Sequence, residues 1–283
     1  MKKMLTPHRA LKMSLAPLVL ILISPFASGS AWTRPEGNLL VLPPISYTYA
    51  DESFDNDGDR QDRNRFEMAE FSPLFEYGIT KSLTVGMQPK YRKVWIETDS
   101  GETLSNEGLA ESDFYIRQQL WSRDQASVSI QLGAKVPISP DEDSEVPLGR
   151  DQVDADIKLA YGNRRPMGGG RIFYSGELGY NKRWDVPADE GSFNAFIGWA
   201  PGASNWAFIL RSANTISLGN DSNDDTEVLT AFPDYKRHDV QLMTSYRFSN
   251  AMSLVGGIST TYAGENVGIG NTAFIALSAP YSL

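Results

Sequence analysis

Twelve stretches of about ten to seventeen residues alternate apolar and polar side chains, and this alternation restricts the possible folds more than any other feature. Successive side chains of a β-strand point to opposite faces, so the pattern predicts strands with one apolar and one polar face. Each stretch is long enough for the roughly 9–11 residues with which a tilted strand crosses a membrane. The predicted strands are 38–50, 66–79, 82–98, 109–122, 126–138, 153–162, 171–184, 192–200, 206–218, 235–248, 252–263 and 272–283.

The connectors between these strands alternate in length. Short turns are expected near 78–82, 122–125, 163–170, 201–204 and 249–251, and longer loops separate them. Bacterial outer-membrane barrels have short turns on the periplasmic rim and long loops on the extracellular rim, and an even strand count returns both ends of the chain to the periplasm. The predicted fold is therefore an all-β, antiparallel, up-and-down transmembrane barrel of about twelve strands.

The two faces of the predicted strands can be assigned from the pattern. Strand 82–98 places Leu83, Val85, Met87, Pro89 and Tyr91 toward lipid and Thr84, Gly86, Gln88, Lys90 and Arg92 toward the lumen; strand 171–184 places Ile172, Tyr174, Leu178 and Tyr180 outward and Ser175, Glu177, Asn181 and Arg183 inward. A soluble periplasmic barrel or sandwich would alternate as well, with the polar face outside. Strand length, an export signal and aromatic residues near the strand ends favour the membrane.

The first 31 residues have the composition of a secretory signal peptide. Lys2, Lys3, Arg9 and Lys12 precede an apolar run over 15–26, and small residues follow up to Ala31. This order predicts export with cleavage before Trp32. A membrane anchor is the alternative, but the run is shorter than the ~20 residues of a spanning helix and contains Pro17 and Pro25. The expected division is a signal peptide over 1–31 and a barrel over 32–283.

Charge and composition exclude several classes of function. Residues 32–283 hold 22 Lys and Arg against 35 Asp and Glu, a net charge of −13, which disfavours a nucleic-acid partner. The chain has no cysteine, so disulfides, thiolate catalysis and cysteine metal sites are absent. No cofactor is expected. The acidic residues concentrate in the predicted long loops, at 51–62, 99–107, 141–145, 185–190 and 221–227.

Charged side chains of both signs occupy many lumen positions. A charge in a narrow barrel must be paired or hydrated, so these positions predict a network of ion pairs with water. The network could brace a sealed lumen, and it could also line a solute path. The residues expected along such a path are Gln88, Lys90, Arg92, Arg117, Lys135, Asp156, Glu177, Arg183 and Arg211.

Two motifs suggest other chemistry only weakly. The run from Asp55 to Asp59 is similar to a calcium loop, but its glycine comes two places early and Phe66 stands where the last ligand should be glutamate. A solvated acidic loop explains it better, with loose divalent bridging to lipopolysaccharide as a further option. His238 is the single histidine of 32–283, and the place two residues later, where outer-membrane phospholipases carry serine, is Val240. A lipid hydrolase is thus the minor alternative.

Three stretches resemble the outer-membrane proteins of the meta-pathway of phenol degradation family. They are FEYGITKSLTVGMQPKY (75–91), GAKVPISPDEDSEVPLGRDQVDADIKLAYG (133–162) and ELGYNKRW (177–184). The resemblance implies a transporter of small organic solutes, aromatic or hydrophobic ones among them. Such a porin-like protein of a Gram-negative outer membrane would have membrane lipids, lipopolysaccharide and the barrel assembly machinery as partners. The last strand ends in Leu283 rather than the usual aromatic residue, and Pro280 removes a backbone donor.

Overall fold

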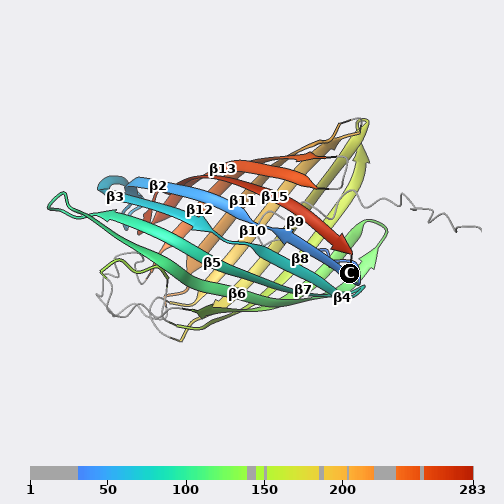
Figure 1. Cartoon of the computed structure of the whole chain (residues 1–283), viewed down its shortest axis with the longest axis horizontal. Helices are drawn as coiled ribbons and strands as arrows, with labels where there is room; N and C mark the ends of the chain where they lie inside the picture. Colours follow the sequence, from blue (N-terminus) through green and yellow to red (C-terminus); the bar gives the residue numbers. More distant parts are fainter. Residues whose placement is uncertain are drawn as a thin grey trace, which may run out of the picture.

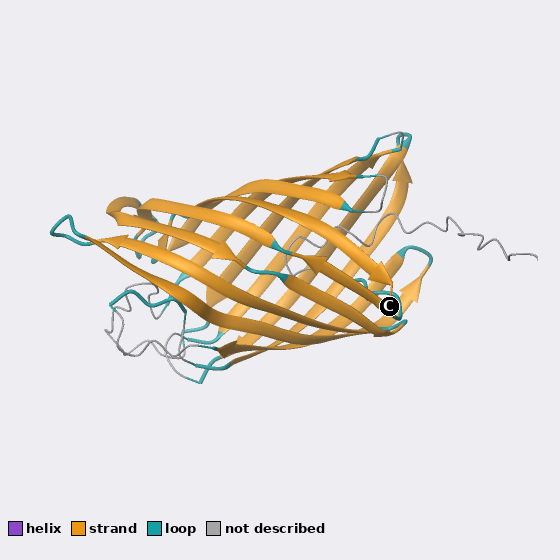
Figure 2. Cartoon of the chain, viewed as in Figure 1, coloured by secondary structure: helices purple, strands orange, loops and turns teal. Residues whose placement is uncertain are grey.

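Twelve antiparallel strands close into a barrel in the computed structural model of the chain (Figures 1 and 2). The structure describes residues 31–138, 145–149, 152–184, 188–202, 204–219, 234–248 and 252–282. The strand segments are β1 (Asn38–Leu42), β2 (Pro44–Phe54), β3 (Arg60–Phe71), β4 (Leu74–Thr80), β5 (Leu83–Glu97), β6 (Thr103–Arg123), β7 (Ala126–Pro137), β8 (Asp154–Met167), β9 (Gly170–Lys182), β10 (Glu190–Pro201), β11 (Trp206–Ser217), β12 (Lys236–Arg247), β13 (Ser253–Glu265), β14 (Val267–Gly268) and β15 (Asn271–Ser282).

The fifteen segments form twelve barrel strands, because β1 with β2 and β3 with β4 are each one strand divided at prolines, and β14 is a two-residue pairing with β2. Pro43 separates β1 from β2, and Ser72 and Pro73 separate β3 from β4, but the pairing register continues across both breaks. Pro89 of β5 lies at the same height, between the pairs Phe71↔Tyr91 and Phe75↔Met87. Proline has no backbone N–H, so three neighbouring strands lose ladder hydrogen bonds at one level of the wall. We refer to Pro43, Pro73 and Pro89 as the proline row.

The barrel is closed by the two ends of the described chain. β15 pairs with β1 and with β2, as shown by the register pairs Asn38↔Ser282 and Tyr49↔Asn271. The predicted strand count and antiparallel order are confirmed. The expected signal peptide covers residues 1–30, which lie outside the described residues, and Ala31; its cleavage before Trp32 stays a prediction.

Apolar side chains cover the outer face, as the alternation predicts. On β9, Leu178 is 62% exposed, whereas its neighbour Glu177 is 2% exposed. The same contrast recurs around the barrel, with exposed Ile45, Met87, Ile116, Leu132, Leu159, Ile197, Leu210, Leu242, Ile258 and Ile275. A soluble sandwich would bury these groups, so the exposed apolar belt identifies a barrel of the outer membrane. The described residues include no helix long and apolar enough to span a membrane.

Aromatic side chains flank this belt, as expected. Trp199, Phe208, Trp206 and Tyr246 form a run of ring contacts near the ends of β10, β11 and β12. Exposed Tyr180 and Tyr262 lie toward the opposite ends of β9 and β13. Rings with one polar edge favour the headgroup region, so the two sets mark the two membrane interfaces.

Several strand boundaries differ from the prediction. Both β2 and β3 continue beyond their predicted ends, and β6 begins at Thr103 rather than 109, so the loops expected at 51–62 and 99–107 are each only five residues long. Above the membrane both faces of a strand meet water, so alternation fades while backbone pairing continues. Figure 1 shows these long strands at the end of the barrel opposite the C-terminus.

The turn expected over 163–170 is also shorter than predicted. β8 runs to Met167 and β9 begins at Gly170, which leaves Gly168 and Gly169 as a two-residue connection. Both have positive φ, at 54° and 72°. Paired positive φ values are required by the tight hairpin turns that match strand twist, and glycine adopts them without strain.

Candidate functional site in the barrel lumen

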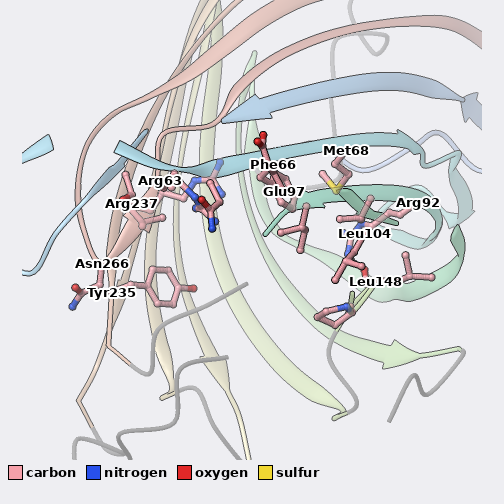
Figure 3. A pocket seen from close by; sticks show the side chains of 18 of the residues that line it. Arg63, Phe66, Met68, Arg92, Glu97, Leu104, Leu148, Tyr235, Arg237 and Asn266 are labelled. Atoms are coloured by element: carbon pink, nitrogen blue, oxygen red, sulfur yellow. The ribbon is translucent and has the colours of Figure 1, made fainter. Parts of the chain in front are cut away.

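A cavity of about 1080 Å³ opens at the end of the barrel that carries the longer loops. We call it the vestibule, and the rule for bacterial barrels makes this the extracellular end. Its walls differ in character (Figure 3): Phe66, Met68, Leu104 and Leu148 lie on one side, and Arg63 and Arg237 lie on the other. The vestibule therefore presents an apolar surface and a polar surface to whatever enters it.

The apolar wall is built by three adjacent strands in register. Phe66 of β3 pairs with Ile96 of β5, which pairs in turn with Leu104 of β6. Two residues between β7 and β8 complete the wall: Val146 and Leu148 pack with buried Val94 and Ala110. Side-chain donors hold that loop, since Asn106 Nδ2 donates to the Val146 carbonyl at 2.9 Å and Arg92 Nη1 donates to the Leu148 carbonyl at 2.8 Å.

Ion pairs form the floor beneath this wall. Arg92 Nε contacts Glu70 Oε2 at 2.7 Å, and Arg92 Nη2 contacts Glu111 Oε1 at 2.8 Å. Lys90 Nζ contacts the same Glu111 oxygen at 2.9 Å and Asp113 Oδ2 at 3.1 Å. Two cations thus alternate with three carboxylates, as the predicted network requires. Glu111 is the shared partner. It lies at the register shift between β5 and β6, where Pro89 pairs with Ser112 and Tyr91 pairs with Leu109.

A second ion cluster lies across the lumen on β8, β9 and β10. Arg183 Nε contacts Asp154 Oδ2 at 3.2 Å, and Arg183 Nη2 contacts Glu190 Oε1 at 2.5 Å. Asn181 Nδ2 donates to both carboxylates at 3.0 and 3.1 Å, and the Tyr235 hydroxyl donates to Glu190. Glu190 was assigned to a loop from the sequence, but it begins β10 and faces this cluster.

The nine expected path residues all lie on lumen-facing positions, but they fall into two groups. Arg92, Lys135 and Arg183 line the vestibule. The others lie deeper or are engaged elsewhere: Lys90 in the floor cluster, Gln88 with the Ser72 carbonyl, Arg117 with Glu76, Asp156 with Lys158, Glu177 with Asn194, and Arg211 near Glu177 and Asp239. Whether a solute touches any of them stays a prediction.

An apolar layer lines the lumen wall below the ion clusters, and the sequence pattern did not predict it. Phe173 and Ile209 lie three residues from the periplasmic ends of β9 and β11, and both are buried. The layer consists of Leu42, Leu74, Tyr115, Phe173, Ala207, Ile209, Met243, Val255, Phe274 and Ala276, with Phe196 and Ala200 packed against it. The lumen is therefore polar only in part, because apolar side chains occupy its wall at this level.

Glycines opposite the aromatic rings explain how the layer fits inside a narrow barrel. Tyr115 pairs directly with Gly86, Phe173 with Gly198, and Phe274 with Gly257. A Cβ on Gly86 or Gly198 would lie 2.1 Å from the facing ring. Each ring therefore folds over a glycine of the neighbouring strand, as aromatic residues do when they cover glycines in designed sheets. Aromatic residues facing glycines in register are the signal that could have predicted the layer.

His238 faces the outside of the barrel rather than the lumen. Its Nδ1 lies 2.9 Å from Asn214 Oδ1, and its ring is 6.2 Å from the Tyr262 ring. Among the residues that the structure describes, no hydroxyl is hydrogen-bonded to this imidazole. A serine hydrolase needs such a contact, so the site gives the hydrolase alternative no support.

The acidic loop at 55–59 also has a local explanation. Asp55 Oδ1 accepts hydrogen bonds from the backbone N–H groups of Asp57 and Asp59, both at 2.9 Å. This is the turn geometry that aspartate commonly stabilises. Within the described ranges no group of three His, Asp or Glu side chains is arranged to hold a metal ion.

Comparison with known proteins places this fold among outer-membrane barrels. No family model and no curated protein matches the sequence. Among solved structures, an outer membrane channel from Pseudomonas putida F1 superposes with a TM-score of 0.69 at 12% identity, over 90% of this chain and 100% of that chain. The NanC porin superposes with a TM-score of 0.51 at 8% identity, over 83% of this chain and 98% of that chain. At these identities the likeness concerns the fold.

Proposed function

We propose that this outer-membrane barrel is a channel for small organic solutes, aromatic and hydrophobic ones among them. The observation that carries the proposal is the two-sided vestibule, in which an apolar wall stands over an ion-paired floor. A solute with an apolar body can lie against Phe66, Met68 and Leu104 while its polar groups meet Arg92 or Arg183. Concave sites with apolar walls and a few placed polar groups are typical of small-molecule binding.

Three further observations support this proposal. The solved structures with the same fold are a channel and a porin by name. The stretches 75–91, 133–162 and 177–184 resemble the meta-pathway of phenol degradation family, whose members are regarded as transporters. The exposed apolar belt requires a lipid environment, so outer-membrane lipids, lipopolysaccharide and the barrel assembly machinery are the expected partners.

Liposome swelling tests the channel and its preference. We expect liposomes containing the protein to take up phenylalanine faster than glutamine, which is similar in size but lacks the ring that the apolar wall would contact. Replacing Leu104 by asparagine should reduce this ratio toward one. Swelling at the rate of empty liposomes for every solute, both in the wild type and in the variant Arg34→Gln, which breaks the ion pair between Arg34 and Glu76, would favour a sealed structural barrel.

Ion selectivity provides a second test at the cluster on β8, β9 and β10. Arg183→Gln removes the cation that neutralises Asp154 and Glu190, so the reversal potential in a salt gradient should shift toward cation selectivity. Arg123→Gln is the matched control because Arg123 is an exposed residue at the end of β6, at the other rim. Equal shifts in both variants, or none in Arg183→Gln, would contradict a path past this cluster.

A further inference from the structure

The chain segment before the first strand lies inside the barrel. Residues 31–36, which we call the N-terminal segment, precede β1, and Gly37 N donates to the Gly78 carbonyl at 2.9 Å where the segment turns into the wall. Thr33 Oγ1 donates to the Lys81 carbonyl at 3.1 Å. Ala31 is fully buried, and its carbonyl accepts a hydrogen bond from Ser127 Oγ at 2.8 Å. The segment therefore occupies the periplasmic part of the lumen.

Arg34 anchors this segment to β4 and β5. Its backbone N–H donates to Thr84 Oγ1 at 2.7 Å, and its side-chain Nε lies 2.5 Å from Glu76 Oε2. Arg34 is 4% exposed, and Glu76 and Thr84 are fully buried. A buried guanidinium is stable only with a close carboxylate partner, so this ion pair fixes the position of the segment.

The wall of the lumen has room for the segment at two glycines. A Cβ on Gly78 would lie 2.1 Å from the Pro35 carbonyl oxygen and 2.7 Å from that of Arg34. A Cβ on Gly162 would lie 2.7 Å from the Trp32 ring. That ring is also covered by the Arg164 guanidinium, 4.1 Å from its centroid. Side chains at either glycine would collide with the segment, so the inner surface is shaped to receive it.

The ion pair can be broken without leaving an unpaired charge in the lumen. Glu76 has two further partners: Arg117 Nη1 at 3.0 Å, and the Tyr115 hydroxyl, which donates at 2.6 Å. Both belong to the barrel wall and remain when Arg34 leaves. Arg34 would then enter water, where its charge is fully solvated. Withdrawal of the segment therefore avoids the large penalty of an isolated buried ion.

We propose that residues 32–36 are a plug that gates the channel: seated, they close the periplasmic end of the lumen, and withdrawn toward the periplasm about a hinge at Gly37, they open it. The inference rests on the proposed function, because only a conducting barrel needs a gate. The plug does not include Ala31, because that residue is expected to be removed with the signal peptide. The contacts of Trp32, Thr33, Arg34 and Pro35 carry it.

Single-channel recording of the full-length mature protein tests the plug. Arg34→Gln removes the anchoring charge, and we expect the open fraction to rise about tenfold, which is the lower end of what a charged hydrogen bond contributes. Arg60→Gln is the matched control, because Arg60 is an exposed arginine of β3 at the other end of the barrel. An open fraction in Arg34→Gln equal to that of the wild type would overturn the proposal.

A reversible cross-link gives a second, independent readout. The chain has no cysteine, so the pair Arg34→Cys and Thr84→Cys would introduce one disulfide between the segment and β5. We expect the oxidised protein to be closed and the same protein, once reduced, to conduct at least tenfold more. Equal conductance in both states, with the disulfide verified by thiol titration, would overturn the plug but not the channel. Absence of conductance in every form, with strand content intact by circular dichroism, would instead contradict the proposed function.

Discussion

Glu76→Gln is expected to lower the free energy of unfolding by about 3–5 kcal/mol, because removing one member of a buried ion cluster leaves the others uncompensated. Glu76 is fully buried and contacts both Arg34 and Arg117. Glutamine preserves the shape of the side chain but not its charge, so two buried guanidinium groups would lose the carboxylate that they share. Urea unfolding of the barrel in detergent micelles, followed by tryptophan fluorescence, measures the change.

A pair at the rim provides the control for this prediction. Glu97 lies 3.7 Å from Arg65, and both side chains are exposed, so Glu97→Gln should cost less than about 1 kcal/mol. The double variant Arg34→Gln with Glu76→Gln should lose less than the sum of its single variants, because the two groups interact directly. A loss below about 1 kcal/mol for Glu76→Gln would show that the cluster is hydrated rather than buried.

Ile258→Arg is expected to destabilise the barrel in phospholipid vesicles by about 2–4 kcal/mol, as arginine does on the lipid face near the bilayer midplane. Ile258 is 60% exposed and lies on the outer face of β13, midway between exposed Leu254 and Tyr262. The substituted guanidinium would meet hydrocarbon instead of water. Urea titration of vesicle-inserted protein measures the loss.

Depth is the variable that makes this result specific to a membrane. Tyr262 lies on the same face of the same strand but near the interface, where arginine costs only about 0–1 kcal/mol, so Tyr262→Arg is the control. A soluble barrel would tolerate both changes equally, because both positions would face water. Equal and small losses for the two variants would therefore contradict the assignment of the outer face.

The strands and their faces were predictable because two solvents act on them. Leu178 faces lipid and Glu177 faces the lumen, so an apolar and a charged residue stand at neighbouring positions of the sequence. Where only one solvent acts, the signal is lost: Thr103 to Glu107 continue β6 above the membrane, yet they read as a loop. Alternation reports the environment of a strand rather than its hydrogen bonds.

The lumen was predicted less completely, for a different reason. The positions of Arg92 and Arg183 follow from alternation, but their partners Glu111 and Glu190 depend on a register shift and on a strand start that no pattern marks. The apolar wall was missed because Phe66 and Val94 occupy lumen positions, where apolar residues contradict the simple rule. The face on which a side chain lies can be predicted from the two-residue period of a strand. Its partner on the next strand can be predicted only when the pairing register of the two strands is known.

The N-terminal segment had no sequence signal at all. It is too short for any periodicity, and the two members of its ion pair, Arg34 and Glu76, are separated by 42 positions. Neither residue type is unusual near the start of a chain or in a strand. Only the closed barrel brings them together, so the contact is a property of the tertiary fold.

The closing contact between β1 and β15 has a consequence for biogenesis. Asn38 pairs with Ser282, so the ring cannot close until β15 has crossed the inner membrane. The segment that enters the lumen is joined directly to β1, the strand that forms this last seam with β15. A chain truncated before β15 would leave the strand edges of β1, β2 and β13 that pair with it exposed, and unpaired edges invite aggregation in the periplasm.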